Sequence, residues 1–195
     1  MIKAIIFDCF GVVIADGLEA VVVEHEKSDP SFRRFVHDTI KQSNRGHIKP
    51  LDSHLRISER LGISPENLQG KIYGGEARNS RVIDLILELR KNYKTALLSN
   101  IGKDSLKHRF SDQELLQLFD AVVASGEVGF AKPEPEAYEI VCERLGVRLD
   151  ESVFIDDREV YCEGARALGM QAIRYEDFDQ MKAELDKLLA ADSKG

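Results

Sequence analysis

Polar side chains that can take part in hydrolysis follow several apolar runs of this sequence. Asp8 follows the run IKAIIF, Ser99 follows TALL, and the adjacent acids Asp156 and Asp157 follow VFI. Lys132 lies in the segment GFAKPEPEAY. Because α/β folds place functional groups at the carboxyl ends of parallel strands, we expect these side chains to meet at one edge of a sheet. The sequence therefore predicts one site assembled from four separate segments.

Asp8 is the candidate nucleophile of this site. A carboxylate can attack a phosphoryl group to give an aspartyl-phosphate, or an alkyl halide to give an ester, and both routes divide one hard step into two. An aspartate that only caps the turn at Gly11 is the structural alternative. Neighbouring side chains of a strand point to opposite faces, so Cys9 is predicted to be a buried structural thiol rather than a second nucleophile.

The order of apolar runs and helical patterns predicts the fold that positions these groups. Buried strands are expected over residues 2–7, 95–98, 121–124, 153–155 and 171–173. Helical patterns lie between them, over residues 82–89, 136–145 and 159–168, and a last one covers residues 178–188. Alternation of this kind predicts an α/β protein with a Rossmann-like, doubly wound parallel sheet.

Residues 15–78 interrupt this alternation after the first strand. They carry helical patterns over residues 32–41, 51–61 and 65–73, and no convincing strand follows the valines at 21–23. An all-helical insertion cannot extend the sheet, so we expect a small helical cap that folds over the site. The predicted division is a core domain of residues 1–14 and 79–195 and a cap domain of residues 15–78.

In type and order these motifs resemble those of the haloacid dehalogenase-like (HAD) hydrolase superfamily, and in particular its phosphatases with an inserted helical cap. The resemblance covers nearly the whole chain, and the segment around Lys132 matches the family pattern Gly-x-x-Lys-Pro. It implies that Asp8 attacks and that Lys132 neutralises the nucleophile and the transferred phosphoryl group. It also implies that Ser99, as part of the catalytic set, and Asn100 bind the phosphoryl group.

The resemblance also implies a Mg²⁺ cofactor. Adjacent carboxylates at a strand end repel each other unless a cation offsets their charge, and Mg²⁺ binds one or two carboxylates together with water. The implied ligands are Asp8, the backbone carbonyl of Phe10, and Asp157. Asp156 and Gly11 are implied to support these ligands.

Two positions depart from the pattern of the HAD phosphatases. Phe10 stands where they carry a second acid, which protonates the leaving oxygen and later activates water. General acid–base catalysis contributes roughly 10²–10⁴-fold, so its loss is serious for an alkyl phosphate and small for an acyl or aryl phosphate. Tyr161 stands where members often carry an acid or Asn, which weakens the expected support of the metal. Asp16 is a hypothetical replacement for the missing acid.

The predicted function is therefore a HAD-like hydrolase, a Mg²⁺-dependent phosphatase that acts on a small organophosphate through an aspartyl-phosphate. Phe10 also fits a 2-haloacid dehalogenase, because halide leaves without a proton. Dehalogenases, however, need no metal, carry a Ser/Asn-rich motif near the fourth strand, and read Gly-Thr-Leu where this chain has Gly-Val-Val after Phe10. A third hypothesis is a HAD domain with little turnover that binds a phosphorylated ligand or a partner protein.

Composition excludes several other classes of partner. The net charge of -7 over 195 residues argues against a nucleic acid or an anionic membrane. The three scattered cysteines fit a reducing compartment, and no apolar run approaches the roughly 20 residues that span a bilayer. We expect a cytoplasmic monomer or homodimer whose partner is a small phosphorylated metabolite.

The predicted cap also carries a run of basic residues. These are Arg33, Arg34, His37, Lys41, Arg45, His47 and Lys49. They could recognise a phosphate or carboxylate as the cap closes, but a solvated helix face is the more common outcome for such a run.

Overall fold

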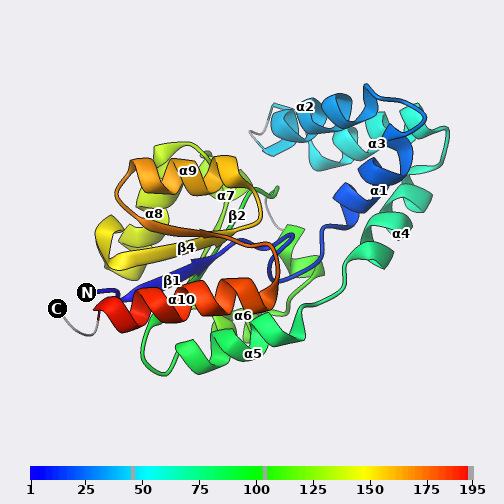
Figure 1. The fold of residues 1–195 in the computed structure, drawn as a ribbon. Coiled ribbons are helices and arrows are strands. Elements are labelled where there is room, and N and C mark those ends of the chain that lie inside the picture. The colour runs from blue at the N-terminus through cyan, green and yellow to red at the C-terminus, as the bar shows by residue number, and fades with distance from the viewer. Residues whose placement is uncertain (45–46, 103–104, 193–195) are drawn as a thin grey trace.

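The structure is a computed structural model, in which residues 1–44, 47–102 and 105–192 are described. Among these, a five-stranded parallel sheet forms the centre of the molecule (Figure 1). Its strands are β1 (Ala4–Phe7), β2 (Lys94–Ser99), β3 (Ala121–Ala124), β4 (Ser152–Asp156) and β5 (Gln171–Arg174), in the order β3-β2-β1-β4-β5. Because β1 is central, Asp8 emerges between the ends of β2 and β4.

Helices cover both faces of this sheet. One side carries α5 (Ser80–Leu89), η1 (Ser105–His108), α6 (Asp112–Leu118) and α10 (Phe178–Asp192). The other side carries α7 (Ser125–Val128), α8 (Pro135–Leu145), η2 (Leu149–Glu151) and α9 (Glu159–Ala167). The Rossmann-like, doubly wound fold is therefore confirmed, and the bounds of the predicted strands are correct to within two residues.

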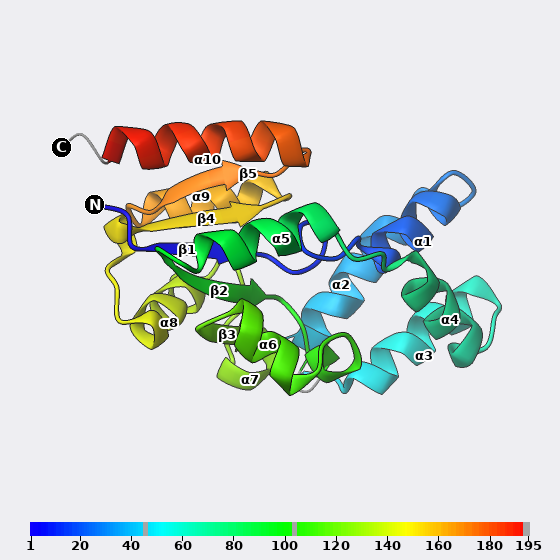
Figure 2. The same ribbon diagram turned by 90° about the horizontal axis from the view of Figure 1, so that it is seen from below.

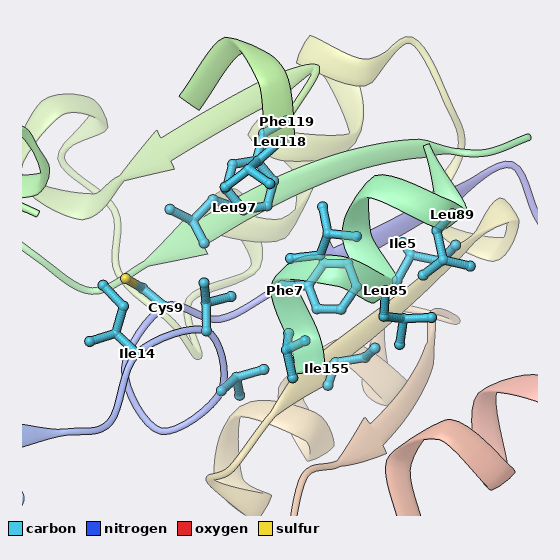
Figure 3. Close-up of a cluster of buried hydrophobic side chains, with 14 of the residues drawn as sticks. Ile5, Phe7, Cys9, Ile14, Leu85, Leu89, Leu97, Leu118, Phe119 and Ile155 are labelled. Carbon is cyan, nitrogen blue, oxygen red and sulfur yellow. The ribbon is translucent and has the colours of Figure 1, made fainter. Parts of the chain in front are cut away.

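Alternation along β1 divides the apolar core into two clusters. Ile5 and Phe7 pack with Leu85 and Leu89 of α5 (Figure 3), whereas Ile6 packs on the opposite face with residues of α8. Burial of alternate side chains on both faces explains why this strand is apolar throughout.

Cys9 lies within the first of these clusters, next to Ile14 (Figure 3). Burial raises the pKa of its thiol well above the ordinary value. Its side chain is fully buried and the thiol is free, as predicted for a structural cysteine. Cys142 and Cys162 are also free and buried.

The insertion folds as four helices beyond the carboxyl ends of the strands (Figure 2). They are α1 (Gly17–Glu26), α2 (Phe32–Asn44), α3 (Pro50–Leu61) and α4 (Pro65–Gly75). The valines at 21–23 lie inside α1, because Asp16 caps this helix by accepting a hydrogen bond from Glu19 N at 3.0 Å. Val21 and Val22 pack inward with Phe32 and Ile57.

Two adjacent segments connect these four helices to the sheet. Ala15 N donates to Ala77 O at 2.8 Å, and Asn79 N donates to Val13 O at 2.9 Å. The division into a core domain and a cap domain at these segments stays a prediction. None of the helices in the described part of the chain combines the length and the apolar character that crossing a membrane requires.

Candidate active site

Lys132 joins two carboxylates at the carboxyl edge of the sheet. Its Nζ donates to Asp8 Oδ1 and to Asp156 Oδ2, at 2.6 Å each. All three side chains are buried, with exposed fractions of 1%, 9% and 0% for Lys132, Asp8 and Asp156. Asp8 and Asp156 meet because β1 and β4 are paired with Phe7 opposite Ile155. The structure thus brings together groups from three of the four predicted segments.

The charges of this cluster influence one another strongly. Burial raises the pKa of Asp8 to about 8, against the opposing effect of the Lys132 ammonium. Burial would lower the pKa of Lys132, but the charges of Asp156 and Asp8 outweigh it and raise the value above its ordinary range. Two carboxyl groups therefore share one ammonium group, and the raised pKa of Asp8 reflects the cost of a second negative charge in this buried cluster.

Asn100 holds the backbone of Lys132 in place. Its side-chain Nδ2 donates to Lys132 O and its Oδ1 accepts from Lys132 N, at 2.8 Å each. A pair of hydrogen bonds to the backbone N–H and C=O of one residue orients the lysine from the end of β2. Asn100 also lines the cavity described below, and its predicted contact with substrate stays a prediction.

Two aromatic rings flank the lysine. The Nζ of Lys132 lies 5.2 Å from the ring centroids of Phe154 and of Tyr161. Both rings can stabilise the ammonium through cation–π attraction. Tyr161, which replaces the acid or Asn of the family pattern, thus contacts the lysine, and its hydroxyl accepts a hydrogen bond from Arg158 at 3.3 Å.

Asp157 carries a carboxylate oxygen that the surrounding chain leaves without a partner. Its Oδ1 is buried and has no hydrogen bond within the described residues. Burial, followed by the charge of Asp156, raises the pKa of Asp157 to about 6. One oxygen atom from each of Asp8, Asp156 and Asp157 lies within 4.8 Å of the others.

These carboxylates fit a hard divalent cation. Both oxygens of Asp156 are already bound, one by Lys132 and the other by Arg158 N at 2.9 Å. Asp157 Oδ1 and the second carboxylate oxygen of Asp8 therefore remain available to bind a cation, and their role as its ligands stays a prediction. Phe10 lines the same cavity, and the role of its carbonyl stays a prediction.

Gly11 permits the close approach of Asp157. Its φ is 89°, a left-handed conformation that favours glycine, and a Cβ here would lie 2.6 Å from Asp157 Cγ. The predicted supporting role of Gly11 therefore has a steric basis.

We expect Gly11→Ala to displace the Asp157 carboxylate and to weaken Mg²⁺ binding by about 10-fold or more, the size found when groups that orient metal ligands are lost. Titration calorimetry with Mg²⁺ measures this effect. Gly62→Ala is the matched control, because Gly62 also has a positive φ, of 65°, but a Cβ there meets nothing within 4 Å. Equal Mg²⁺ affinity in the two variants would contradict the steric role.

Ser99 places a hydroxyl beside the cluster at the end of β2. The side chain is buried, and its Oγ has no hydrogen-bond partner among the residues that the structure describes. Since β1 and β2 are paired, this hydroxyl and Asp8 leave adjacent strands at the same edge. A buried hydroxyl beside Asp8 that has no partner in the described part of the chain is suited to donate a hydrogen bond to a bound ligand.

Arg109 and Glu76 lie between the sheet and the inserted helices, and no motif in the sequence points to them. Arg109 donates to Glu76 through Nε at 2.9 Å and Nη2 at 2.6 Å, and both side chains are largely buried. The Arg109 guanidinium carbon lies 4.9 Å from the Phe10 ring and 5.0 Å from the Tyr73 ring. Phe10 thus packs against a paired arginine, a contact that no spacing in the sequence reveals.

The remaining candidates surround a cavity between the sheet and the inserted helices. It has a volume of about 1060 Å³ and is lined by Asp8, Ser99, Lys132 and Asp157, among others. Asp16 also lines it; burial raises the pKa of this carboxyl, and its hydrogen bond to Glu19 N gives it a structural role. Its part in proton transfer stays a prediction.

The basic run of the insertion divides between paired and open side chains. Arg33 is paired with Glu19 and Glu26 at 2.6 Å, and the exposed Arg34 lies 3.8 Å from Asp38. His37 and Lys41 line the cavity, and His47 and Lys49 are exposed. Arg45 lies outside the described residues.

Removing the metal is expected to make stability fall as the pH rises. The pKa of Asp8 is raised from 3.8 to about 8, and that of Asp157 from 3.8 to about 6. Between pH 3.8 and about 8, the metal-free folded chain therefore holds more protons than the unfolded chain. The free energy of unfolding then falls as the pH rises from about 4 to about 8. We expect the Tm difference between Mg²⁺ and chelator to grow by several degrees across this window, and a constant difference would contradict the assignment.

Comparison with known proteins identifies the family of this chain. A family model described as haloacid dehalogenase-like hydrolase matches residues 2–169. The structure of a HAD family enzyme of Bacteroides thetaiotaomicron, in complex with magnesium and inorganic phosphate, superposes with a TM-score of 0.71. The two chains are 26% identical, and the match covers 91% of this chain and 98% of the other.

Curated relatives include phosphatases and dehalogenases. The bifunctional epoxide hydrolase 2 of Sus scrofa is 30% identical over 142 residues, which cover 70% of this chain but 25% of that protein, so this chain spans about a quarter of its length. The sesquiterpene phosphatase astK of Aspergillus oryzae is 25% identical over 192 residues, with 96% of each chain covered. The (S)-2-haloacid dehalogenase of Xanthobacter autotrophicus is also 25% identical over 192 residues, covering 89% of this chain and 75% of the relative. The chain therefore belongs to the haloacid dehalogenase-like hydrolase family.

Proposed function

We propose that this hydrolase is a Mg²⁺-dependent phosphatase that acts on a small organophosphate. The observation that carries the proposal is the buried, unpartnered Oδ1 of Asp157 beside Asp8 in a cluster of three carboxylates with one lysine. A divalent cation would offset the repulsion between the carboxylates of this cluster. Halide displacement by a carboxylate needs no such cation, so the arrangement favours the phosphatase.

In the proposed reaction, a carboxylate oxygen of Asp8 attacks phosphorus and the bond to the leaving oxygen breaks, which gives an aspartyl-phosphate. Water then attacks phosphorus, so that inorganic phosphate is released and the carboxylate is regenerated. Lys132 Nζ orients Asp8 and offsets charge on the phosphoryl oxygens, and Ser99 Oγ donates a hydrogen bond to one of them. Mg²⁺, held by Asp8, Asp157 and the Phe10 carbonyl, would supply further neutralisation of phosphoryl charge.

The side chain of Phe10 cannot protonate a leaving group. The carboxylate or aryloxide of an acyl or aryl phosphate can leave without that proton, because it is a much more stable anion than an alkoxide. We infer that such phosphates are turned over faster than alkyl phosphates. The sesquiterpene phosphatase and the magnesium and phosphate complex among the relatives support the reaction class.

We expect Phe10→Asp to raise kcat for an alkyl phosphate such as glycerol phosphate by about 10²-fold, since an acid is restored beside the leaving oxygen. Phenyl phosphate should gain much less, because it depends less on that proton. Phe10→Leu is the control, since it also removes the ring from Arg109 but adds no acid. Parallel changes for both esters in Phe10→Asp would contradict the inference.

A dehalogenase is the second candidate. The aromatic residue at position 10 and the 2-haloacid dehalogenase among the relatives favour it. The third candidate function is a HAD domain with little turnover that binds a phosphorylated ligand or a partner protein. Phe10 and Tyr161, which depart from the pattern of the phosphatases, suggest it.

The deciding experiment measures inorganic phosphate from acyl, aryl, sugar and nucleotide phosphates, with Mg²⁺ and with chelator, and halide from 2-haloacids in parallel. Mg²⁺-dependent phosphate release supports the phosphatase. Chelator-resistant halide release without phosphate release would overturn it in favour of the dehalogenase, and absence of both would favour a binding role. A small phosphorylated metabolite as partner, a cytoplasmic location and a monomer or homodimer remain predictions.

A further inference from the structure

The cavity is larger than its phosphoryl-binding end requires. Its volume of about 1060 Å³ lies at the upper end of ordinary ligand pockets, which measure roughly 300–1,000 Å³. Asp8, Ser99, Lys132 and Asp157 form one end, and helices of the insertion form the other. The organic part of a substrate must therefore lie against the inserted helices.

The lining on that side combines polar side chains with six aliphatic ones. Leu18, Val22, Val36, Ile40, Leu51 and Ile72, called the cap wall below, line the cavity from α1, α2, α3 and α4. Val22, Val36 and Ile72 belong to the buried apolar cluster of these helices, so their positions are fixed by packing. A substrate hydroxyl buried against such side chains loses its hydrogen bonds to water without replacement. This cost disfavours the binding of substrates whose organic part is a sugar.

The arginines that line the cavity already have partners within the protein. Arg33 contacts the carboxylates of two cap glutamates at 2.6 Å. Arg109 forms two hydrogen bonds with Glu76. Arg158 stacks on the ring of Tyr161, with 5.0 Å between its guanidinium carbon and the ring centroid. A second phosphate or carboxylate on the substrate would have to compete with these contacts.

The histidines that line the cap side also add little positive charge. Burial lowers the pKa of His37 and of His54, which favours their neutral forms. Lys41 is exposed to solvent, so its charge is hydrated. On the cap side, apolar contact therefore comes from the cap wall, and the neutral histidines and the hydrated lysine do not build a second anion site there.

We propose that this enzyme, given the phosphatase activity proposed above, selects monophosphates whose organic part is an apolar aryl group seated against the cap wall. The inference rests on the proposed function for the reaction itself. The preference for an apolar organic part is argued from the cap wall and the paired arginines. It agrees with the absence of an acid at Phe10, because an aryl leaving group needs no proton.

A series of 4-alkylphenyl phosphates tests the proposal, because the leaving group stays chemically constant while its apolar length grows. We expect kcat/KM to rise at least about 10-fold from the methyl to the butyl compound, and to drop again when the butyl chain ends in a hydroxyl. A flat or falling series, or a tolerated hydroxyl, would overturn the proposal.

Variants then locate the effect. Leu51 is 64% exposed and lines the cavity, so Leu51→Gln should reduce the gain from methyl to butyl by about 3-fold without disturbing a packed core. Leu116→Gln is the matched control, since Leu116 is 73% exposed on α6 and does not line this cavity. An equal loss in both variants would remove the cap wall as the cause.

Binding separates this inference from the reaction itself. Non-hydrolysable 4-alkylbenzylphosphonates are titrated in the presence of Mg²⁺ by calorimetry. Tighter binding with chain length but no phosphate release from any ester would keep the inference and reject the phosphatase. Phosphate release with no dependence on chain length, in either turnover or binding, would keep the phosphatase and reject the inference.

Discussion

Asp8→Asn is expected to lower Mg²⁺-dependent phosphate release by at least about 10³-fold, which corresponds to about 4 kcal/mol of lost transition-state stabilisation. The amide has nearly the shape of the carboxylate but no nucleophilic oxygen, and Asp8 is the acid held by Lys132 at the end of the central strand. Release of inorganic phosphate from phenyl phosphate and from acetyl phosphate measures the loss.

The matched control for this change is Asp84→Asn. Asp84 is an exposed aspartate on α5, and its substitution should leave turnover unchanged. Circular dichroism and the Tm of Asp8→Asn establish that the variant is folded. A folded Asp8→Asn variant with more than a tenth of the normal rate would exclude Asp8 as the nucleophile.

Lys132→Met is expected to damage both stability and activity. Methionine keeps the length of the side chain, but it leaves Asp8 and Asp156 buried without their shared ammonium. Loss of one partner of a buried ion pair costs about 3–5 kcal/mol in free energy of unfolding, and a protein of this size loses roughly 2–4 °C of Tm per kcal/mol. Phosphate release should fall about 10²–10³-fold, as for loss of one strong electrostatic contact.

Two further variants separate these effects. Lys3→Met breaks an exposed ion pair with Glu151 and should cost less than about 1 kcal/mol. The double variant Lys132→Met/Asp156→Asn removes one of the two unpaired charges, so it should recover part of the stability without recovering activity. A Lys132→Met protein as stable as Lys3→Met would contradict the buried pairing.

The cluster of side chains around Lys132 could be predicted because each member obeys a local rule. Asp8, Ser99 and Asp157 directly follow or nearly follow the ends of apolar runs, and parallel pairing brings strand ends to one edge. The segment Gly-x-x-Lys-Pro around Lys132 points to this residue, and the alternation of strand and helix patterns predicts the fold class. These rules depend on residues that are close together in the sequence.

Contacts between distant segments escape such rules. Arg109 and Glu76 are 33 residues apart and belong to no motif, yet they form the ion pair against which Phe10 packs. The two hydrogen bonds between Asn100 and the Lys132 backbone depend on how two loops meet. The valines at 21–23 are β-branched residues, which favour strands, yet they lie in a helix. Asp16 caps the first turn of this helix, and its inner face is buried in a cluster of helices.

The inserted helices leave and rejoin the sheet at a single narrow neck. Ala15 pairs with Ala77, Ile14 bridges to Arg78, and Asn79 bonds back to Val13. With respect to the sheet, the insertion between Ala15 and Ala77 is one long loop whose two ends are in contact. Substitutions, insertions or deletions inside that loop need not change the strand register. The residues that break the bond and the residues that select the substrate can therefore change independently during evolution. Descendants of one ancestral chain can thus acquire new substrates through changes in the loop alone.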